Sequence, residues 1–438
     1  MKIAMITAGG AGMFCGSCMQ DNTLVRTLRM VDVDAVLVPA YTPIRVDEEN
    51  ASSERVFLGG INVYLDSAIP FWSKLPNWLT AWLNRPSVIR WLSKFGTSTD
   101  AAKLGPLTLD MLRGDAGPQR REIDELVRFL VDDLNPDVVL LSNALISGLL
   151  PQLRRSYRGK ILILLQGDDI FLEGLPERYR TEAIRLIAEN CRHVDGFMTH
   201  SQYYADFMRC YLHIEPAKFE VIPLTVDTSQ LPDFSAPLQS AEKRFRVGYF
   251  ARICPEKGAF RFLSLLPELV SSDPQIDAVI AGFLPEQHRA RFEKQLSEVQ
   301  KAVPQGRIHW AGSPSSRPEK FDLLMSLNVL CVPAEYREPK GIYVLEAGLA
   351  GVPVVVPSHG AFPERIQDIG TGRLASPKDS GEFIRSIRDL KQEYGTISHL
   401  AAEEGSQARR ILRDHVIQRH SMQATGQPIL EAITRLTK

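Results

Sequence analysis

The chain has 438 residues, 44% of them hydrophobic and 24% charged, a balance typical of a folded globular protein rather than a disordered one. This length suits two domains of roughly 200 residues better than a single core. The formal net charge of -1 argues against bulk electrostatic binding of nucleic acid, because no chain-wide positive field exists to attract phosphates.

The sequence opens directly on a strand pattern at 3–7 and carries no recognisable secretion signal. Its apolar runs all fall short of the roughly 20 residues that a membrane-spanning helix needs. The six cysteines are expected to be reduced thiols rather than a disulfide framework. We therefore expect a cytoplasmic protein.

Short apolar runs alternate with amphipathic segments through the first half, which predicts a parallel sheet flanked by helices. Helices are expected at 122–134 and 176–191. The predicted strands of this half are 3–7, 35–38, 138–142, 161–166, 196–199 and 219–223.

One segment, 69–96, interrupts this rhythm with four of the five tryptophans and with basic but no acidic residues. A basic, tryptophan-rich amphipathic segment can lie in a membrane interface. It can equally pack on its own domain, form a dimer contact or line an acceptor pocket. Prolines at 76 and 86 break it into short helices, so we rank self-packing or acceptor lining ahead of membrane contact.

A segment rich in proline and serine at 228–244 reads as a linker, and the strand–helix rhythm restarts after it. We expect an N-terminal domain at 1–235 and a C-terminal domain at 236–417, with the last helix, about 418–438, a candidate to return to the first domain. The strands predicted in the second half are 246–251, 278–281, 307–310, 329–332 and 354–356.

The strongest candidate site follows the strand predicted at 329–332. There the segment Glu338-Pro-Lys-Gly-Ile-Tyr-Val-Leu-Glu346 runs from a polar loop into a helix opened by Gly341. The first turn of a helix has unpaired backbone N–H groups at the positive end of the dipole, which favours a phosphate. Glu338 precedes that helix, and Glu346, about one and a half turns into it, can reach a ribose hydroxyl pair.

A second candidate follows the strand predicted at 246–251. In Gly248-Tyr-Phe-Ala-Arg252-Ile-Cys-Pro-Glu256-Lys257-Gly258, Arg252 ends the strand and Lys257 stands at the start of a helix. Two fixed cations there can neutralise a diphosphate leaving group, where charge develops as its bond breaks. The lesser alternative makes both residues ordinary solvated charges.

The loop after the first strand, 7–18, is rich in glycine, which lets backbone approach a ligand closely. It fails the dinucleotide fingerprint: a pattern starting at Gly10 needs a glycine where Cys15 stands. The second strand also ends in Val38-Pro39 rather than in an acid that could bind a ribose.

These segments resemble glycosyltransferase family 4, a retaining family of the GT-B fold. The resemblance rests on 338–346 and 252–258, together with Gly360-Ala361-Phe362-Pro363-Glu364 and Thr371-Gly372-Arg373-Leu374, and covers most of the second half. It implies an α/β protein of two Rossmann-like domains facing each other across a central cleft. It also implies a nucleotide-sugar donor, such as a UDP- or GDP-sugar, bound by the second domain and an acceptor bound by the first.

Residue roles follow from the same resemblance. Glu338 would contact the donor sugar, and Glu346 the ribose. Arg252 and Lys257 would stabilise the departing diphosphate, so that no metal or other cofactor is needed. The backbone amides near Gly341, Ile342 and Tyr343 would face the diphosphate. From the other domain, the loop at Gly10 and Gly12 would approach the donor phosphate.

Two acids, Asp168 and Asp169, follow the strand predicted at 161–166, where many family members carry a histidine. The chain departs from the family here, because it has no histidine in this segment. One of these acids would orient an acceptor hydroxyl, or Asp169 would simply cap the next helix. The acceptor itself is left open between a small molecule, a glycan and a lipid-linked sugar.

Other patterns carry less weight. Cys15 and Cys18 form a C-x-x-C, but no second ligand pair with zinc spacing accompanies it, so close packing is preferred over metal or redox chemistry. Asp32 and Asp34 match a D-x-D metal motif without its context, and we regard this as coincidence. Of the isolated histidines 200, 309 and 359, His359 has the best claim to a role because it adjoins Gly360.

The sequence thus predicts a metal-independent, retaining hexosyltransferase, cytoplasmic or peripheral at the inner face of the membrane. A non-catalytic nucleotide-sugar-binding or membrane-tethering protein is the main alternative. A sugar-nucleotide epimerase, a phosphorylase and an NAD-dependent dehydrogenase rank lower.

Overall fold

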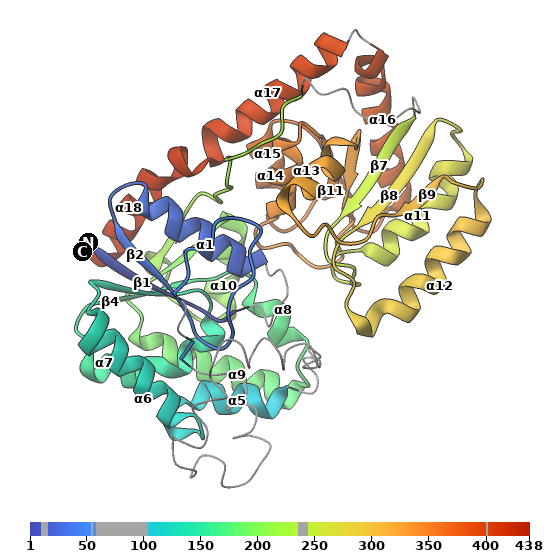
Figure 1. Ribbon diagram of the computed structural model, residues 1–438. Coiled ribbons are helices and arrows are strands. Elements are labelled where there is room, and N and C mark those ends of the chain that lie inside the picture. Colours follow the sequence, from blue (N-terminus) through green and yellow to red (C-terminus); the bar gives the residue numbers. More distant parts are fainter. Residues whose placement is uncertain (10–15, 54–55, 58–103, 235–243, 400–401) are drawn as a thin grey trace. The chain divides into compact units, whose positions relative to one another are not determined.

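The computed structural model describes residues 1–9, 16–53, 56–57, 104–234, 244–399 and 402–438 (Figure 1). The chain forms two compact units, the first made of Met1–Thr225 and Met422–Lys438 and the second of Val226–Ser421. The expected segment 69–96, the loop residues Gly10, Gly12 and Cys15, and most of the expected linker lie outside the described residues. Among the described helices, none is long and apolar enough to cross a membrane.

The first unit is built on a parallel sheet in the order β2-β1-β3-β4-β5-β6. Nearly all of the residues of its central strands are buried, as expected when helices cover both faces. The strands are β1 (Lys2–Thr7), β2 (Asp34–Pro39), β3 (Val138–Leu141), β4 (Lys160–Leu164), β5 (Gly196–Thr199) and β6 (Phe219–Val221).

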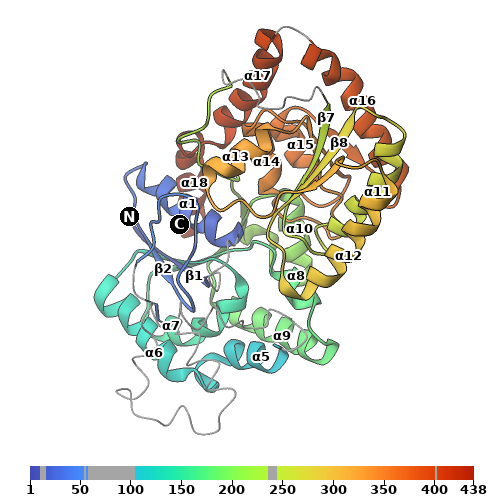
Figure 2. The ribbon, with the colours of Figure 1, turned by 45° about the vertical axis from the view of Figure 1, so that its right-hand side comes forward.

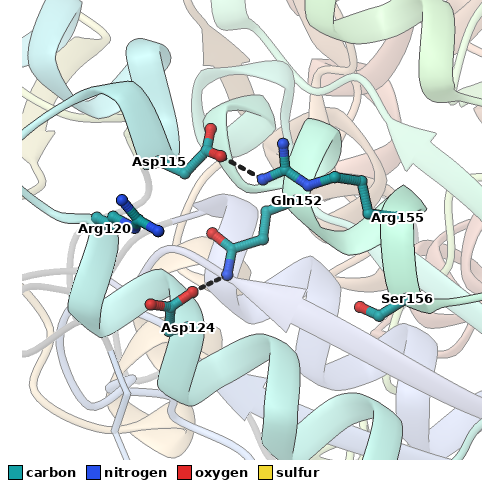
Figure 3. Close-up of a pocket in the computed structure, with 6 residues that line it drawn as sticks. All are labelled: Asp115, Arg120, Asp124, Gln152, Arg155 and Ser156. Carbon is teal, nitrogen blue, oxygen red and sulfur yellow. Dashed lines mark hydrogen bonds and ion pairs between the residues drawn. The ribbon is translucent and has the colours of Figure 1, made fainter.

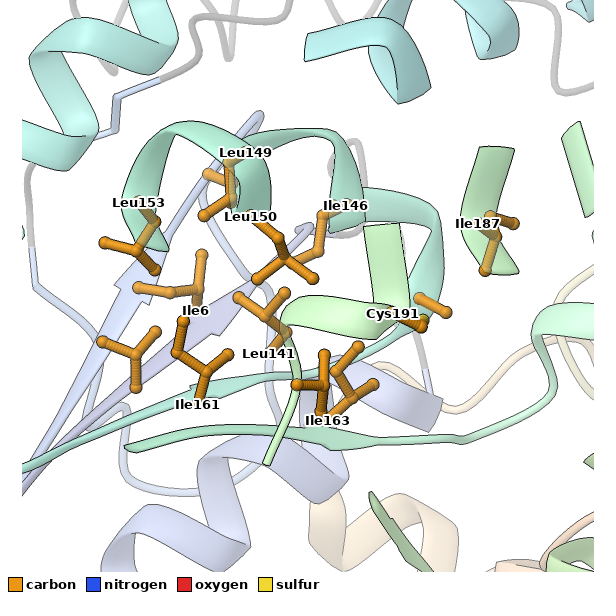
Figure 4. Close-up of a cluster of buried hydrophobic side chains, with 14 of the residues drawn as sticks. Ile6, Leu141, Ile146, Leu149, Leu150, Leu153, Ile161, Ile163, Ile187 and Cys191 are labelled. Carbon is orange, nitrogen blue, oxygen red and sulfur yellow. The ribbon is translucent and has the colours of Figure 1, made fainter. Parts of the chain in front are cut away.

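Alternate residues of these strands enter two cores, one on each face of the sheet. In β1, Ala4 and Ile6 join one core, and Ile3 and Met5 join the other. Figure 4 shows the first of these cores, in which Ile6, Leu141, Ile161 and Ile163 of the strands meet Leu149, Leu150 and Leu153 of the helical layer.

Most helices of the first unit lie between its strands in the sequence, but one comes from the C-terminal end of the chain. That helix, α18 (Met422–Thr437), packs against α1 (Gly16–Arg29), as both ribbon views show (Figure 2). The remaining α-helices are α5 (Gly105–Arg113), α6 (Arg120–Arg128), α7 (Leu150–Ser156), α8 (Asp168–Glu173), α9 (Glu177–Asn190) and α10 (Gln202–Tyr211). Short turns are η5 (Gly114–Ala116), η6 (Phe129–Leu134), η7 (Ala144–Leu149), η8 (Cys191–His193) and η9 (Pro216–Lys218).

The second unit has a parallel sheet in the order β12-β11-β10-β7-β8-β9. Read from the other edge and renumbered within the unit, this is the 3-2-1-4-5-6 order of a Rossmann sheet. Its strands are β7 (Phe245–Phe250), β8 (Ile276–Ala281), β9 (Ile308–Trp310), β10 (Val329–Cys331), β11 (Val354–Pro357) and β12 (Arg373–Ala375). Its helices are α11 (Ala259–Ser271), α12 (Glu286–Ala302), α13 (Arg317–Met325), α14 (Ile342–Leu349), α15 (Phe362–Ile369), α16 (Ser380–His399) and α17 (Ala402–His420).

The strand order reverses between β7 and β10, which makes this the topological switch point of the second sheet. In open α/β sheets a ligand binds outside the carboxyl ends of the strands at such a point, because the two following connections diverge to opposite faces. The segment 251–258 follows β7, and the segment 332–341 follows β10. The topology therefore brings the two strongest sequence motifs to one place.

The strands predicted from sequence are confirmed within a few residues at their ends, but β12 was not predicted. One predicted helix, 122–134, is two elements, because α6 gives way to a π-helical turn, η6, whose C-cap residue Asn135 has a left-handed conformation. The predicted last helix, 418–438, also begins differently: α17 ends at His420 and α18 starts at Met422, around the bridge between Ser421 and Val226.

Candidate functional site

The two segments at the switch point are joined through their backbones. The Glu335 N–H donates to the carbonyl of Glu256 at 2.9 Å. Gly258 has φ +72°, and a Cβ placed there would lie 2.0 Å from the carbonyl oxygen of Pro333. Only glycine fits this crossing, so the residue after Lys257 fixes how closely the two segments approach.

Glu338 is the centre of the site that results. Its Oε2 accepts from the Lys257 ammonium at 2.6 Å, from the Tyr336 hydroxyl at 2.7 Å and from the Tyr343 hydroxyl at 2.9 Å. The Lys257 Nζ also lies 4.8 Å from the ring centroid of Tyr336 and 5.1 Å from that of Tyr343, within the range of cation–π attraction. Two sequence candidates, Lys257 and Glu338, are thus in direct contact.

The charges of this cluster are set by burial and by one another. Burial, the largest influence, raises the pKa of Glu338, but the Lys257 charge and the hydrogen bonds from Lys257 and both tyrosines outweigh it and lower that pKa. Burial and the Glu338 carboxylate raise the pKa of Tyr336 and Tyr343 well above the usual value. Glu338 is therefore an anion held inside the protein by one ammonium and two neutral hydroxyl donors.

The turn after β11 supports Glu338 from behind. Gly360 has φ +62°, and a Cβ there would lie 2.6 Å from the Glu338 nitrogen and 2.7 Å from its oxygen. The Ala361 N–H donates to the same Glu338 carbonyl at 2.8 Å. The Gly360 motif found in the sequence therefore sets the position of the Glu338 backbone.

Arg252 lies at the other end of the β7 segment and is exposed. The turn that carries it is fastened by Tyr249, whose buried hydroxyl lies 3.0 Å from the Arg252 carbonyl and 3.2 Å from the Lys257 carbonyl. One residue thus holds both ends of the turn, so Arg252 and Lys257 keep a fixed separation.

Helix α14 begins where the sequence indicated. Gly341 is its N-cap, with φ +71° and no side-chain cap, and Ile342 and Tyr343 open the first turn. The helix begins after the segment that follows the carboxyl end of β10, so its first backbone N–H groups lie at the same edge of the sheet as Glu338.

Glu346, further along α14, is paired with a residue that the sequence analysis missed. Its Oε1 lies 2.9 Å from the Lys320 ammonium, and both side chains are largely buried. Lys320 comes from α13, 26 residues earlier, with no local pattern to connect the two. Glu346 is thus ion-paired with a residue outside the Glu338 cluster.

In the first unit the structure separates the two candidate acids after β4. Asp168 is buried, and its two carboxylate oxygens accept from the backbone N–H groups of Ala144 and Gln166. Asp169 is only partly buried and accepts from the Tyr204 hydroxyl at 2.6 Å. Neither acid is the N-cap of α8, because that position is Gly167 with φ +116°.

The remaining candidates from the sequence lie outside the Glu338 cluster. Cys18 is buried in α1, and its sulfur lies 3.9 Å from the Thr7 hydroxyl. Asp34 is the first residue of β2, and Asp32 lies in the turn before it with φ +58°. His359 packs near Phe362, and burial lowers its pKa.

The first unit also has a polar pocket on its helical layer, which we do not assign to the candidate site (Figure 3). It is lined by Asp115, Arg120, Asp124, Gln152, Arg155 and Ser156. Its groups largely satisfy each other, since Arg155 pairs with Asp115 and Gln152 donates to Asp124. None of its lining residues comes from the carboxyl end of a strand.

Comparison with known proteins points to one enzyme class. Residues 232–409 match the family model "Glycosyl transferases group 1". A lipopolysaccharide core biosynthesis mannosyltransferase of Rhizobium meliloti is 35% identical over 125 residues, covering 28% of this chain and 34% of the relative. A 2-deoxystreptamine glucosyltransferase of Streptomyces kanamyceticus is 25% identical over 45% of this chain and 51% of the relative. The matches therefore span about a third to a half of these relatives.

Solved structures match over nearly the whole chain. The Anabaena protein Alr3699/HepE, solved with UDP, superposes with a TM-score of 0.64 at 17% identity over 99% of this chain and 100% of that one. Sucrose-phosphate synthase of Thermosynechococcus elongatus gives a TM-score of 0.68 at 15% identity, over 99% and 98% of the two chains. At such identities the likeness concerns the fold, and it confirms the expected GT-B class with two Rossmann-like α/β units. The chain thus has a GT-B fold whose residues 232–409 carry the signature of the glycosyl transferases group 1.

Proposed function

We propose that the protein is a retaining glycosyltransferase of family 4, which moves a hexose from a UDP- or GDP-sugar to an acceptor hydroxyl without a metal. The observation that carries the proposal is the Lys257–Glu338 cluster at the carboxyl edge of the Rossmann sheet, at its switch point. The match of residues 232–409 to the glycosyl transferases group 1 model supports the same reaction class. So do the glycosyltransferases among the relatives of this chain.

In this proposal the donor diphosphate binds at the start of α14, beside Lys257 and Arg252. The bond between the anomeric carbon and the phosphate oxygen breaks, and its electron pair stays on that oxygen. The acceptor oxygen bonds to the anomeric carbon on the same face, and its proton passes to the departing phosphate. The two cations stabilise the charge that develops, which is where a fixed electrostatic environment lowers a barrier most.

Glu338 has a double part in this mechanism. Its carboxylate can accept hydrogen bonds from the hydroxyls of the donor sugar, because it is held as an anion by its neighbours. It also holds the Lys257 ammonium at the site until the diphosphate arrives and competes for that cation. Glu346 would receive the ribose hydroxyls while Lys320 keeps its carboxylate in place.

The proposal places two positive side chains beside the diphosphate to neutralise it, as a divalent ion would, and for this reason no metal is expected. The acceptor would bind to the first unit at the carboxyl ends of its strands. Location in the cytoplasm, with contact to the inner face of the membrane through 69–96, is part of the same proposal.

The first test is a thermal-shift titration of the full chain with UDP, GDP, ADP and NAD in the presence of EDTA. A ligand at 100 times its Kd adds about 2.7 kcal/mol of stability. Stabilisation by UDP or GDP alone would identify the donor base. Stabilisation by NAD alone would favour a dehydrogenase, and no response to any diphosphate would refute the donor site.

Turnover is tested separately, by release of UDP or GDP from a panel of their sugars with and without EDTA. Full activity in EDTA is expected, and activity restored only by Mg²⁺ or Mn²⁺ would overturn the metal-independent mechanism. Binding of the nucleotide sugar without turnover on any acceptor would favour a non-catalytic binding protein.

A further inference from the structure

Asp168 and Asp169 are neighbours in sequence but have different surroundings. Both oxygens of Asp168 are used by backbone N–H groups, those of Ala144 after β3 and of Gln166 after β4. This buried carboxylate ties two strand-end loops together. Asp168 is therefore occupied by the fold, and an acceptor would have to reach Asp169 instead.

Asp169, the next residue, is only partly buried. Its Oδ1 accepts from the Tyr204 hydroxyl at 2.6 Å, and that hydroxyl accepts in turn from the Gly167 N–H at 3.0 Å. Tyr204 is fully buried, so its hydroxyl is fixed in this one arrangement. The carboxylate of Asp169 is thus oriented by a rigid donor while part of the side chain remains accessible.

One turn of α8 further on, Glu173 repeats the arrangement. It accepts from the Tyr211 hydroxyl at 2.8 Å, and Arg180 of α9 donates to its other oxygen at 2.9 Å. Two acids on one helix are therefore each held by a tyrosine of the neighbouring helix, α10.

The tyrosines belong to a stack of aromatic rings along α10. Ring centroids are 6.1 Å apart between Tyr204 and Phe207 and 5.4 Å apart between Phe207 and Tyr211, with the ring planes within 24° of parallel. Of these rings, Phe207 and Tyr211 are half-buried. Aromatic rings beside carboxylates offer the two contacts that a sugar ring needs, apolar packing for its C–H face and acceptors for its hydroxyls.

We propose that Asp169 is the residue that receives the reacting hydroxyl of the acceptor, and that the Asp169–Glu173 face binds an uncharged polyhydroxylated ring. This inference rests on the proposed glycosyltransferase function. Charge argues for the uncharged class: the face presents two carboxylates and one guanidinium, so a phosphate group on the acceptor would meet net repulsion.

The test measures binding of methyl α-D-mannopyranoside, methyl α-D-glucopyranoside and myo-inositol by saturation-transfer NMR, with glucose 6-phosphate as the charged probe. We expect the full chain to bind at least one uncharged ring and to bind the phosphate more weakly. Asp169→Asn should weaken the uncharged ring about 10-fold, the effect of losing one charge-assisted hydrogen bond. Glu177→Gln, an exposed acid at the start of α9, is the matched control and should change nothing.

The pH profile separates a direct contact from a structural effect. Burial, with a smaller part from Asp168, raises the pKa of Asp169 to about 6 even though the Tyr204 hydrogen bond lowers it. Binding by the wild type should therefore fall between pH 7.5 and pH 5, and binding by Asp169→Asn should be flat. The groups that act on Asp169 in this profile are Asp168 on α8 and Tyr204 on α10. Tyr211 on α10 interacts with Asp169, and also with Glu173 on α8 and Arg180 on α9.

Nucleotide binding is measured in parallel on every variant by thermal shift. If no uncharged ring binds, or if glucose 6-phosphate binds better, the inference fails while a normal response to UDP or GDP leaves the proposed function intact. If Asp169→Asn binds the rings as the wild type does, Asp169 is the wrong residue. If the nucleotides also fail to bind the wild type, the proposed function fails on its own evidence.

Discussion

The Nζ of Lys257 lies 2.6 Å from Oε2 of Glu338, so the cation assigned to the donor diphosphate and the carboxylate assigned to the donor sugar neutralise each other. The side chain of Glu338 is 4% exposed and that of Lys257 is 19% exposed, so their attraction is only weakly screened. A diphosphate would compete with Glu338 for this ammonium. Donor binding and the state of Glu338 should therefore be coupled.

Lys257→Ala tests that coupling most directly. The variant should lose a factor of about 100 to 1,000 in kcat, the usual effect of removing one group that stabilises the leaving charge. It should also lose about 3 to 5 kcal/mol of stability, because it leaves a buried carboxylate without its counter-charge. Kinetics with the donor identified by thermal shift, together with urea unfolding, would measure both effects.

The double variant Lys257→Ala/Glu338→Gln separates the two effects. Removing the orphaned charge should restore much of the stability but none of the activity, since the leaving group still lacks its cation. Recovery of activity in the double variant would show that Lys257 acts only by balancing Glu338.

Acid should weaken the fold through Glu338. Its pKa is lowered in the folded protein, so its contribution to stability is complete above the unfolded value of about 4.3 and is lost as the pH falls through the folded value. Glu338→Gln should be less stable than the wild type at pH 7, and the difference should shrink steadily below about pH 5. Melting temperatures from pH 3 to pH 8 would measure this.

Glu335→Gln is the control for that series, because Glu335 is exposed and lies only three residues away. The melting temperature of this variant should change with pH in the same way as that of the wild type. A difference between the wild type and Glu338→Gln that stays constant with pH would mean that the carboxylate titrates alike in the folded and unfolded states.

The positions of the strands along the chain and the two candidate donor motifs could be predicted because they are local. Buried parallel strands read as short apolar runs, and loops such as 252–258 and 338–346 carry their pattern in consecutive residues. The short edge strand β12 lacked such a run and was missed. The sequence could therefore predict the strands of the two sheets and the candidate residues in the loops that follow them.

The partners of those residues could not be predicted, because they come from distant segments. Lys320 reaches Glu346 from another helix, and Tyr204 reaches Asp169 across 35 residues of sequence. Tyr336 adjoins the motif, yet nothing in the sequence indicated that its hydroxyl and that of Tyr343 meet on one oxygen. Tertiary packing decides such contacts, and one sequence alone carries no record of them.

Tyr343→Phe should destabilise the protein by about 1.5 to 3 kcal/mol, since it removes one donor from a buried charge. It should also raise the pKa of Glu338, because a hydrogen bond that stabilises the anion is lost. Urea unfolding at pH 7 would measure the first effect, and melting temperatures from pH 3 to pH 5 the second. Tyr179→Phe is the matched control, as its hydroxyl contacts only the exposed Arg178 among the described residues; an equal loss in both variants would contradict a special part for Tyr343.

Gly360→Ala should disturb the site without touching a functional group. A methyl group there would clash with the backbone of Glu338 and would require φ +62° of a non-glycine residue. We expect a loss of about 1 to 3 kcal/mol in stability and reduced affinity for the donor. Gly306→Ala is the control, because Gly306 has φ +77° but nothing within 4 Å of an added Cβ. If both variants behave alike, the strain comes from φ alone and the contact with Glu338 has no effect.

Glu346→Gln should weaken nucleoside diphosphates but leave pyrophosphate binding unchanged, because the proposed function assigns the lost charge to the ribose and not to the phosphates. A carboxylate that accepts from two hydroxyls contributes about 1.5 to 3 kcal/mol, so the affinity for UDP or GDP should fall about 10- to 100-fold. Lys320→Met should weaken the same ligands by leaving Glu346 without its partner at 2.9 Å. Calorimetry with UDP, GDP and pyrophosphate would measure the three affinities. Equal loss for pyrophosphate would move Glu346 to the phosphate end of the site, and no loss for any ligand would make the pair with Lys320 a purely structural contact.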